Sequence, residues 1–403
     1  MRPVLPTSIA LAAAALAAAA PAPAQSYRPS GTCDGFPKLA LKTAPGLCVG
    51  LVARRLGFPR GVAILGSDVY VTDLGARRPG RGRLLRLRNG GRSPPETLLS
   101  RLDQPSGLAP APNGQLYLGE PARILRIDPN APDIARSARV ILDGLPGDGL
   151  HNLTAFAVAA DGALHVNLGS ATDNCENPDG SPQRIPCFEA TARPPRGSIL
   201  RVVPQVGRAV HARDAEVVAR GLRNAMALAF TRQGDLVAAT NARDAIHSVD
   251  PKLSDVNLPH DLLVRIVRGG DYGWPYCFDA LRPSPEYPRF PCRTKRAPER
   301  LLPAHSAPLG ALVYPGGGLP GPSDRLVLAL HGYRRHGHRI VAFDLDAKGM
   351  TKAPMRDIVS GWNAAPGLRP RGAPTALAAA PDGSIYVVED RNGTLLRIAR
   401  ARR

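Results

Sequence analysis

One unit recurs six times along the 403-residue chain, and this repetition limits the possible folds more than any other feature. Each copy has a small residue, three or four apolar positions, a turn, an alternating strand, and a second apolar strand that ends in Arg or Asp. Asn-Gly, Asp-Gly and Gly-Asp turns, of the kind that favour hairpins, punctuate the copies. The copies begin at Arg60, Ser106, Thr154, Met226, Gly310 and Thr375.

Such a unit cannot bury both of its faces alone, but several units packed radially can, as the blades of a β-propeller do. A β-sandwich or a pair of small β domains has no reason to repeat one pattern over its whole length. The 41 Gly and 42 Pro would also interrupt most helices, whereas short strands joined by turns accommodate them. The sequence therefore predicts an all-β chain in which residues 25–403 form a single six-bladed β-propeller.

The spacing of the repeats predicts where the long loops lie. The first copies start 46 to 48 residues apart, and the later ones are further apart. We therefore expect insertions at 171–196, 247–305 and 353–372, and we expect the third strand of the fourth copy at 245–250. Function is often carried by loops of this kind, because a rigid scaffold holds them in place.

Six cysteines form three pairs that are close in sequence: Cys33 and Cys48, Cys175 and Cys187, and Cys277 and Cys292. The sequence does not fix the connectivity, but pairing between neighbours is the simplest choice and places one disulfide in each local loop. Disulfides are typical of an oxidising compartment. Metal binding is the alternative, although the chain has no C-x-x-C motif and no Cys beside a His.

The N-terminus also indicates export. Arg2 precedes an apolar run at 9–20, and the small residues at 21–24 follow it, as in a secretory signal peptide cut near Ala24. A run of 12 residues is too short to span a bilayer, so we expect a periplasmic or secreted chain without stable membrane insertion. The net charge is +19, but the 46 Arg are scattered singly or in pairs. No basic helix or aromatic-interleaved stripe supports a nucleic-acid partner.

Polar residues cluster at equivalent edges of several repeats, and in a propeller these edges converge on the central axis. His151 stands directly before the first strand of the third copy, where an imidazole suits a general base, although a structural histidine is the alternative. Arg223 and Asn224 occupy the matching place before the fourth copy. A guanidinium beside an amide suits an anionic, carbonyl-bearing ligand, and a loop salt bridge is the alternative.

Further candidates follow along the chain. The turn at 240–244 offers the amide of Asn241, the guanidinium of Arg243, the carboxylate of Asp244 and free carbonyls such as that of Ala242. These oxygens suit a hard cation such as calcium, and an ordinary polar turn is the alternative. The aromatic cluster at 272–277 can stack on a flat ligand or pack beneath a loop. Cationic groups recur at His331, Arg369 and Arg371, whereas GxGxxG, Walker and HExxH motifs are absent.

The order of these motifs resembles the quinoprotein sugar dehydrogenases, the group of the soluble glucose and sorbosone dehydrogenases. The resemblance runs from about residue 58 to 398, and it is carried by His151, RGSILRV from Arg196, GLRNAMALAF from Gly221, TNARDAI from Thr240 and YGWPYC from Tyr272. It implies a six-bladed propeller that binds pyrroloquinoline quinone (PQQ) and calcium. It also implies a sugar or polyol substrate, and an external electron acceptor because the chain has no C-x-x-C-H haem motif.

The resemblance implies roles for particular residues. His151 is the expected base, and the expected calcium ligands lie at Ala242, Arg243 and Asp244. The expected cofactor contacts are Arg223, Asn224, Asn241, Arg243, His331, Arg369 and Arg371. This chain has Ala242-Arg243 where the glucose enzyme has Gly-Pro, and its fifth-repeat edge has His331 and no Lys.

Two other classes remain open from the sequence. A calcium-dependent lactonase or other hydrolase can use the same fold but needs several axial carboxylates, for which Asp148, Asp173 and Asp244 are the obvious candidates. A non-catalytic propeller that binds a protein or a glycan predicts no cofactor uptake.

Overall fold

A computed structural model describes residues 29–321, 324–332, 334–362 and 372–401 of the chain. The predicted signal peptide at 1–24 and the predicted cofactor residues Arg369 and Arg371 lie outside these ranges. Within the described residues, no helix has the length and apolar character needed to cross a membrane.

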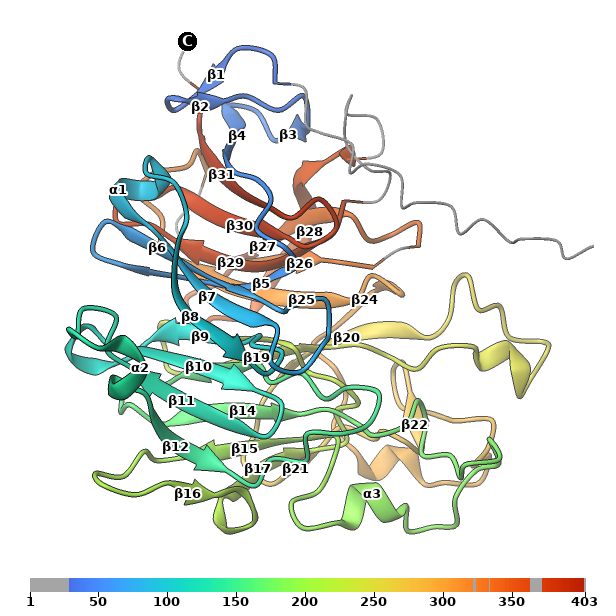
Figure 1. The fold of residues 1–403 in the computed structure, drawn as a ribbon. Helices are drawn as coiled ribbons and strands as arrows, with labels where there is room; N and C mark the ends of the chain where they lie inside the picture. The colour runs from blue at the N-terminus through green and yellow to red at the C-terminus, as the bar shows by residue number, and fades with distance from the viewer. Residues whose placement is uncertain (1–28, 322–323, 333, 363–371, 402–403) are drawn as a thin grey trace, which may run out of the picture.

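Six mainly antiparallel sheets surround a central axis and form the blades of a six-bladed β-propeller, which confirms the predicted fold class (Figure 1). The first three blades are β5–β8 (Pro59–Leu65, Asp68–Asp73, Gly82–Leu87, Glu96–Leu102), β9–β12 (Leu108–Pro110, Leu116–Glu120, Arg123–Ile127, Arg139–Asp143) and β13, β14, β15 and β17 (Phe156–Val158, Leu164–Leu168, Ser198–Val202, Glu216–Arg220). The last three blades are β18, β19, β20 and β24 (Ala227–Phe230, Leu236–Thr240, His260–Arg265, Arg300–Ala304), β25–β28 (Pro308–Tyr314, Arg325–Leu330, Arg339–Leu345, Thr351–Ser360) and β29, β30, β31 and β4 (Pro374–Ala379, Ile385–Glu389, Thr394–Arg400, Leu47–Ala53).

Short elements decorate the blades. The remaining strands are β1 (Thr32–Cys33), β2 (Phe36–Pro37), β3 (Lys42–Thr43), β16 (Val210–His211), β21 (Gly270–Asp271), β22 (Cys277–Phe278) and β23 (Arg282–Pro283). The helices are α1 (Arg88–Gly91), α2 (Ile134–Ser137), α3 (Phe188–Thr191) and the 3-10 turns η1 (Pro112–Gly114), η2 (Ala212–Asp214), η3 (Ile246–Ser248) and η4 (Cys292–Thr294).

The ring is closed by strands from opposite ends of the chain. The outer strand β4 of the sixth blade precedes the first blade in sequence, and it pairs with β31 so that Leu51 lies opposite Leu396. The disulfide between Cys33 and Cys48 joins the segment before β4 to the start of this strand. The N-terminal strand β4 therefore completes the sixth blade through a ladder of hydrogen bonds, and the chain runs on from it into the first blade.

Each blade buries both faces against its neighbours, which explains why the repeats read as apolar runs. In β19, Val237 and Ala239 belong to the core shared with the fifth blade, whereas Leu236 and Ala238 belong to the core shared with the third. Successive side chains of a strand point to opposite faces, so one strand serves two interfaces. A strand buried on both sides needs apolar residues at consecutive positions.

The fourth blade differs from the prediction. Residues 245–250, the predicted third strand, contain the 3-10 turn η3, and the third strand is β20 further along the chain. The predicted insertion at 247–305 therefore contains two blade strands, β20 and β24. The segment at 245–250 ends at Pro251, whereas β20 pairs with residues 237–240 of β19. Likewise, β28 occupies the first half of the predicted insertion at 353–372, because it is an outer strand with a polar exposed side.

The cysteine-containing insertions lie on one side of the propeller, where α3 and β22 are seen in Figure 1. The disulfides Cys175–Cys187 and Cys277–Cys292 confirm local pairing, as does the N-terminal disulfide. The two insertions touch, because the backbone amide of Cys187 donates to the Tyr276 hydroxyl at 2.6 Å. The inserted loops thus support one another beside the axis.

Candidate active site

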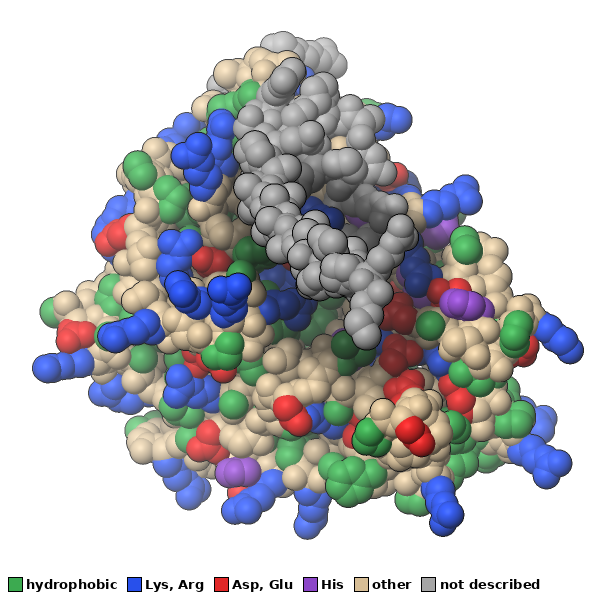
Figure 2. Space-filling model, turned by 45° about the vertical axis from the view of Figure 1, so that its right-hand side comes forward, with side chains coloured by type: hydrophobic (Ala, Val, Ile, Leu, Met, Phe, Trp, Pro, Cys, Tyr) green, Lys and Arg blue, Asp and Glu red, His purple; other side chains and the backbone are tan. Residues whose placement is uncertain are grey.

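A cavity of about 490 Å³ opens on the axis at the end where the second strand of each blade stops. This volume lies within the usual range of small-molecule sites. Figure 2 shows a hollow near the middle of the molecule, with Lys and Arg side chains gathered on one side and Asp and Glu on the other. The lining residues are Arg60, Arg77, Leu150, His151, Leu153, Asn224, Met226, Asn241, Asp244, Ala307, Leu309 and His331. Five residues that the sequence singled out, His151, Asn224, Asn241, Asp244 and His331, therefore meet in one cavity.

His151 is held in one tautomer. Its Nδ1 lies 2.8 Å from the Ser170 hydroxyl and 3.2 Å from the Ser170 carbonyl. The hydroxyl of Ser170 donates to the Thr172 carbonyl at 2.7 Å, so both Ser170 oxygens are acceptors toward the imidazole. Nδ1 therefore carries the hydrogen, and Nε2 has the lone pair that remains for a ligand. Burial and then the charge of Arg223 lower the pKa of His151 to about 3.

Asn224 lies next to His151, and its amide is oriented by a second asparagine. The Ala225 amide donates to Asn167 Oδ1 at 2.9 Å, and Asn167 Nδ2 donates to Asn224 Oδ1 at 3.1 Å. The Nδ2 group of Asn224 is therefore the part that can donate to a ligand. A Cβ on Gly169 would lie 2.5 Å from His151 Cβ and 3.0 Å from Asn224 Oδ1, so only glycine lets these two side chains approach.

Asn241 follows β19 and lines both the central cavity and a smaller one of about 30 Å³. Its Oδ1 is buried and accepts no hydrogen bond. Buried polar atoms almost always have a partner, because leaving one unmet is costly. Asn241 Oδ1 can therefore accept a hydrogen bond from a donor group of a ligand.

His331 lies on the sixth-blade side of the cavity in a buried charged cluster. Its Nε2 is 3.1 Å from both carboxylate oxygens of Asp390, and Arg60 Nη1 is 2.8 Å from Asp390. Burial lowers the pKa of His331, although Asp390 opposes this. Burial would raise the pKa of Asp390, but His331 and Arg60 outweigh it and lower the value to about 2. Asp390 is therefore ionised and fixes both neighbours.

Arg223 is buried and does not line the central cavity. Its Nε donates to the Asp173 carbonyl at 2.8 Å and its Nη1 to the Ala242 carbonyl at 2.7 Å, while Nη2 pairs with the Asp173 carboxylate. Arg243 is also buried; its Nη1 pairs with Glu286 and its Nε donates to the Asp244 carbonyl at 3.3 Å. Both guanidinium groups thus hold the loops behind the cavity.

These contacts decide whether the turn fits a calcium ion. The Ala242 and Asp244 carbonyls are hydrogen-bonded by arginine side chains, and the Asp244 carboxylate lies 3.3 Å from His305 Nδ1 and 3.4 Å from Arg223. Calcium needs six to eight oxygens that can face the ion together. The oxygens of Ala242 and Asp244 do not fit a calcium ion in this arrangement.

Asp261 positions two parts of the cavity wall, the turn after β19 and the segment before β25. It is buried on β20, and its carboxylate accepts from the Ala242 amide at 2.8 Å, the Ala307 amide at 2.7 Å and the Ser306 hydroxyl at 2.9 Å. These three bonds connect the turn after β19 to the start of β25. Asp261 therefore holds two neighbouring blades in register at the site.

The aromatic cluster packs beneath a loop. Tyr276 stacks on Phe290 with a centroid distance of 4.3 Å and meets Tyr287 edge to face. Trp274 is buried and its Nε1 donates to the Asp173 carbonyl at 3.3 Å. These rings therefore pack against one another and beneath the loop, which is the structural role that the sequence left open.

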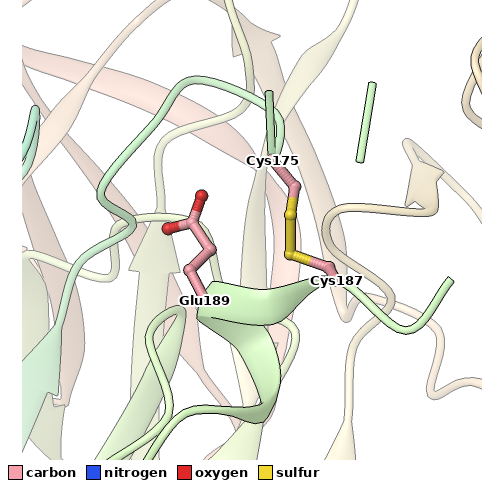
Figure 3. A group of neighbouring side chains, drawn as sticks. All are labelled: Cys175, Cys187 and Glu189. Atoms are coloured by element: carbon pink, nitrogen blue, oxygen red, sulfur yellow. A yellow bond between two sulfur atoms is a disulfide. The ribbon is translucent and has the colours of Figure 1, made fainter. Parts of the chain in front are cut away.

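One group of potential metal ligands lies in the 171–196 insertion: Cys175, Cys187 and Glu189, whose ligand atoms are within 4.8 Å of one another (Figure 3). The two sulfurs form a disulfide, and Glu189 accepts from the Ala171 amide at 2.5 Å and from the Thr172 hydroxyl. A disulfide offers no thiolate to a metal. The disulfide and the hydrogen bonds of Glu189 therefore stabilise the insertion.

Sequence reasoning missed the partners of the site residues. Ser170, Asp390 and Asn167 were not singled out, although Ser170 and Asp390 come within two residues after β14 and β30. Asn241 and His331 directly follow the second strands of their own blades. In the sequence, the positions that follow the second strand of a blade therefore indicate where the site residues lie.

Known proteins match this chain over part of its sequence and over most of its fold. No protein-family model matches the chain. An uncharacterized protein of Borreliella burgdorferi is 28% identical over 192 residues, which are 45% of this chain and 48% of that protein. The chain therefore matches only about half the length of this curated relative.

Solved structures match over most of the chain. Iodide and calcium structures of a Trichoderma reesei enzyme of carbohydrate-active family AA12 have TM-scores of 0.72 and 0.71 at 17% identity, and they cover 92% and 91% of this chain and 100% and 98% of that one. The holo PQQ domain of pyranose dehydrogenase from Coprinopsis cinerea has a TM-score of 0.69 at 20% identity, with 91% and 99% covered. PQQ-bound aldose sugar dehydrogenase from Streptomyces coelicolor has 0.60 at 18%, with 89% and 99% covered. The chain shares its fold with these proteins.

Proposed function

We propose that this propeller is a quinoprotein oxidoreductase, which oxidises a hydroxyl-bearing carbon of a sugar or related polyol and transfers the hydride to PQQ in the axial cavity. The proposal includes removal of residues 1–24 as a signal peptide, a single domain at 25–403, and export to the periplasm or the medium. The three disulfides support export. Electrons leave to a separate acceptor.

The observation that carries the proposal is the state of His151. A neutral imidazole with its lone pair at Nε2 lines a ligand-sized cavity, and Ser170 fixes that tautomer. A base in this state can take the proton of a hydroxyl group as the adjacent carbon loses its hydride. Both products of the bond cleavages then have a destination: the proton on Nε2 and the hydride on the quinone.

The cavity residues fit PQQ. The cofactor, when bound, supplies an electrophilic quinone carbonyl that accepts the hydride, and it carries three carboxylates. Arg60 and Arg77 bring positive charge to the lining, Asn224 offers Nδ2 as a donor, and Asn241 Oδ1 lacks a donor. Guanidinium and amide groups are suited to carboxylate and carbonyl groups. The PQQ-bound proteins that share the fold support the same choice.

The chain's own residues have separate tasks in this reaction. His151 holds and moves the proton, while Ser170 keeps Nε2 directed toward the substrate. Asn224 orients a carbonyl or hydroxyl oxygen next to His151. Asp390 fixes His331 and Arg60 on the opposite wall. The narrow axial channel beneath the cavity, about 110 Å³ and lined by the inner strands, leaves the open end as the way in.

The alternatives have less support. The hydrolase needs axial carboxylates around a metal, but Asp148 is exposed and paired with Arg196, and Asp173 is covered by Arg223. Of these three carboxylates, that of Asp244 alone is among the described residues that line the cavity. The binding propeller gives no reason for an oriented neutral imidazole at the axis, and it predicts that PQQ does not bind.

Uptake of PQQ by the purified chain tests the proposal. We expect one equivalent per chain, seen as a shift in PQQ absorbance and quenching of its fluorescence. The variant Asn241→Leu removes an acceptor at the site and is expected to weaken PQQ binding about tenfold, the cost of one lost hydrogen bond. The variant Asn130→Leu, in an exposed turn of the second blade, is the control and should bind as the wild type does. No uptake by the wild type would refute the proposal.

The pH profile of turnover follows from the lowered pKa of His151. The base works only when Nε2 is unprotonated, and a pKa of about 3 keeps it so throughout the neutral and mildly acidic range. We expect kcat/KM to stay level from neutral pH down to about pH 5 and to fall only as the pH approaches that pKa. The variant Ser170→Asp places a carboxylate on Nδ1 and should move the acid limb upward. A wild-type acid limb near the ordinary histidine pKa would contradict this assignment.

A further inference from the structure

The positively charged guanidinium of Arg223 lies among the oxygens of the turn after β19. All three nitrogens of the Arg223 guanidinium are in use: Nε on the Asp173 carbonyl, Nη1 on the Ala242 carbonyl, and Nη2 on the Asp173 carboxylate with Asp244 at 3.4 Å. Carbonyl and carboxylate oxygens in this number are what a hard metal ion takes in proteins. Arg223 gathers them from the 171–196 insertion and from the turn after β19.

A second arginine engages the Asp244 carbonyl, two residues further along the same turn. Arg243 Nε donates to the Asp244 carbonyl at 3.3 Å, and its Nη1 pairs with the buried carboxylate of Glu286. Asp244 is also fixed from its backbone, because its amide donates to the Asp173 carboxylate at 2.9 Å. The turn is thus held from both sides by fixed, hydrogen-bonded groups.

We propose that the guanidinium of Arg223 takes the place of a calcium ion at the 241–244 turn, so that the chain binds its quinone without calcium there. The cofactor part of this proposal rests on the proposed function. The part that concerns calcium itself depends only on the residues around Arg223. Arg223 is then a positioning residue, which shapes the turn behind Asn241 and Asp244.

Calcium cannot enter this arrangement without expelling Arg223. An ion on the Ala242 carbonyl would stand beside the guanidinium of Arg223, which donates to that oxygen at 2.7 Å, and like charges at such distances repel strongly where water is excluded. Moving Arg223 away would leave its own charge and that of Asp173 without their buried partner, which is a heavily unfavourable state. Arginine has a planar fork of donors and a charge that persists at any working pH, so it is well suited to a permanent replacement.

The surroundings fix Arg223 in place. Its carbonyl accepts from the amide of Ser170, the residue that orients His151, at 2.8 Å. The Asp173 carbonyl accepts a second bond from Trp274 at 3.3 Å, and the Cys175–Cys187 disulfide follows two residues later. The guanidinium therefore connects the turn to a stapled insertion, as a structural metal ion would.

The first test measures calcium alone. After dialysis against EGTA, the wild type is expected to show no heat of binding in a calorimetric titration with CaCl₂ and no change in Tm when CaCl₂ is added. The variant Arg223→Met removes the guanidinium and frees the Ala242 and Asp173 oxygens. We expect this variant to gain one calcium site per chain and to be stabilised by CaCl₂. The variant Arg220→Met, at an exposed arginine three residues earlier, is the matched control and should stay unresponsive.

The second test measures PQQ uptake by fluorescence quenching, with EGTA and with CaCl₂. We expect the wild-type Kd to agree within about twofold between the two conditions. Uptake that requires calcium, or one tight calcium site in the wild type that Asp244→Asn removes, would overturn the proposal. If Arg223→Met folds and still takes no calcium, Arg223 is not the replacement and the proposal fails. If Arg223→Met does not fold, Arg223→Lys provides the second comparison: it retains a cation and is expected to bind no calcium, and a calcium site in it would overturn the proposal.

The two proposals fail in different ways. Absence of PQQ uptake under both conditions would overturn the proposed function, whereas the titrations of the wild type and of Arg223→Met with calcium alone would still decide the role of Arg223.

Discussion

Replacing His151 with alanine is expected to lower kcat for sugar oxidation by about 10²–10⁴-fold, the usual contribution of a general base, without loss of PQQ uptake. The reason is that His151 presents an unprotonated Nε2 to the cavity, whereas the cofactor contacts expected from Asn224, Asn241 and Arg77 remain in place. Dye reduction by the PQQ-loaded protein with a panel of aldoses, ketoses and polyols measures kcat.

The control for this experiment is His211→Ala, on the edge strand β16 of the second blade. It removes a histidine outside the cavity and should leave kcat unchanged. If His151→Ala turns over as fast as the wild type, the base lies elsewhere in the cavity. His331 would then be the next residue to replace, because its imidazole is the other one in the lining.

Replacing Asp261 with alanine is expected to lower the free energy of unfolding by about 3 kcal/mol, because two half-buried amides lose their acceptor. These are the Ala242 and Ala307 amides, 2.8 and 2.7 Å from the carboxylate. Urea unfolding followed by tryptophan fluorescence measures the change as a lower midpoint at constant m.

A matched substitution distinguishes this role from a general effect of losing an aspartate. Asp235→Ala, on the same blade, removes an exposed partner of Arg265 and should cost at most about 1 kcal/mol. Asp261→Asn retains one acceptor oxygen and should fall between the wild type and Asp261→Ala. Equal losses for Asp261→Ala and Asp235→Ala would show that Asp261 does not brace the two blades.

The repeats predicted the blades because a strand buried on both faces must be apolar at consecutive positions. Because of this requirement, β19 and β30 could be recognised in the sequence as parts of one recurring unit. It did not locate β20, because the apolar run at 245–250 has the same local pattern as a strand until Pro251 ends it. Nor did it reveal β28, whose exposed edge carries polar residues such as Lys352 and Asp357. Local pattern therefore describes least well a strand that competes with a similar nearby segment, such as β20, or one with a polar exposed side, such as β28.

The candidate site was predictable where backbone position alone places a residue. His151 and Asn241 line the cavity because they stand where inner and second strands meet the axis. The direction of a long side chain depends instead on which charges surround it. Arg223 and Arg243 turn toward Asp173 and Glu286, which come from insertions far away in sequence. No local sequence pattern links those residues, so the sequence alone does not predict these two ion pairs.

The closure of the ring by β4 and β31 has a consequence for how the protein acquires its site. Contacts between such distant parts of a chain raise the contact order, and chains of high contact order fold slowly. The ion pair between Arg60 of the first blade and Asp390 of the sixth spans the same seam and belongs to the cavity wall. A chain that is still being synthesised therefore has no complete cavity, and the axial pocket is finished only when the last strand is available.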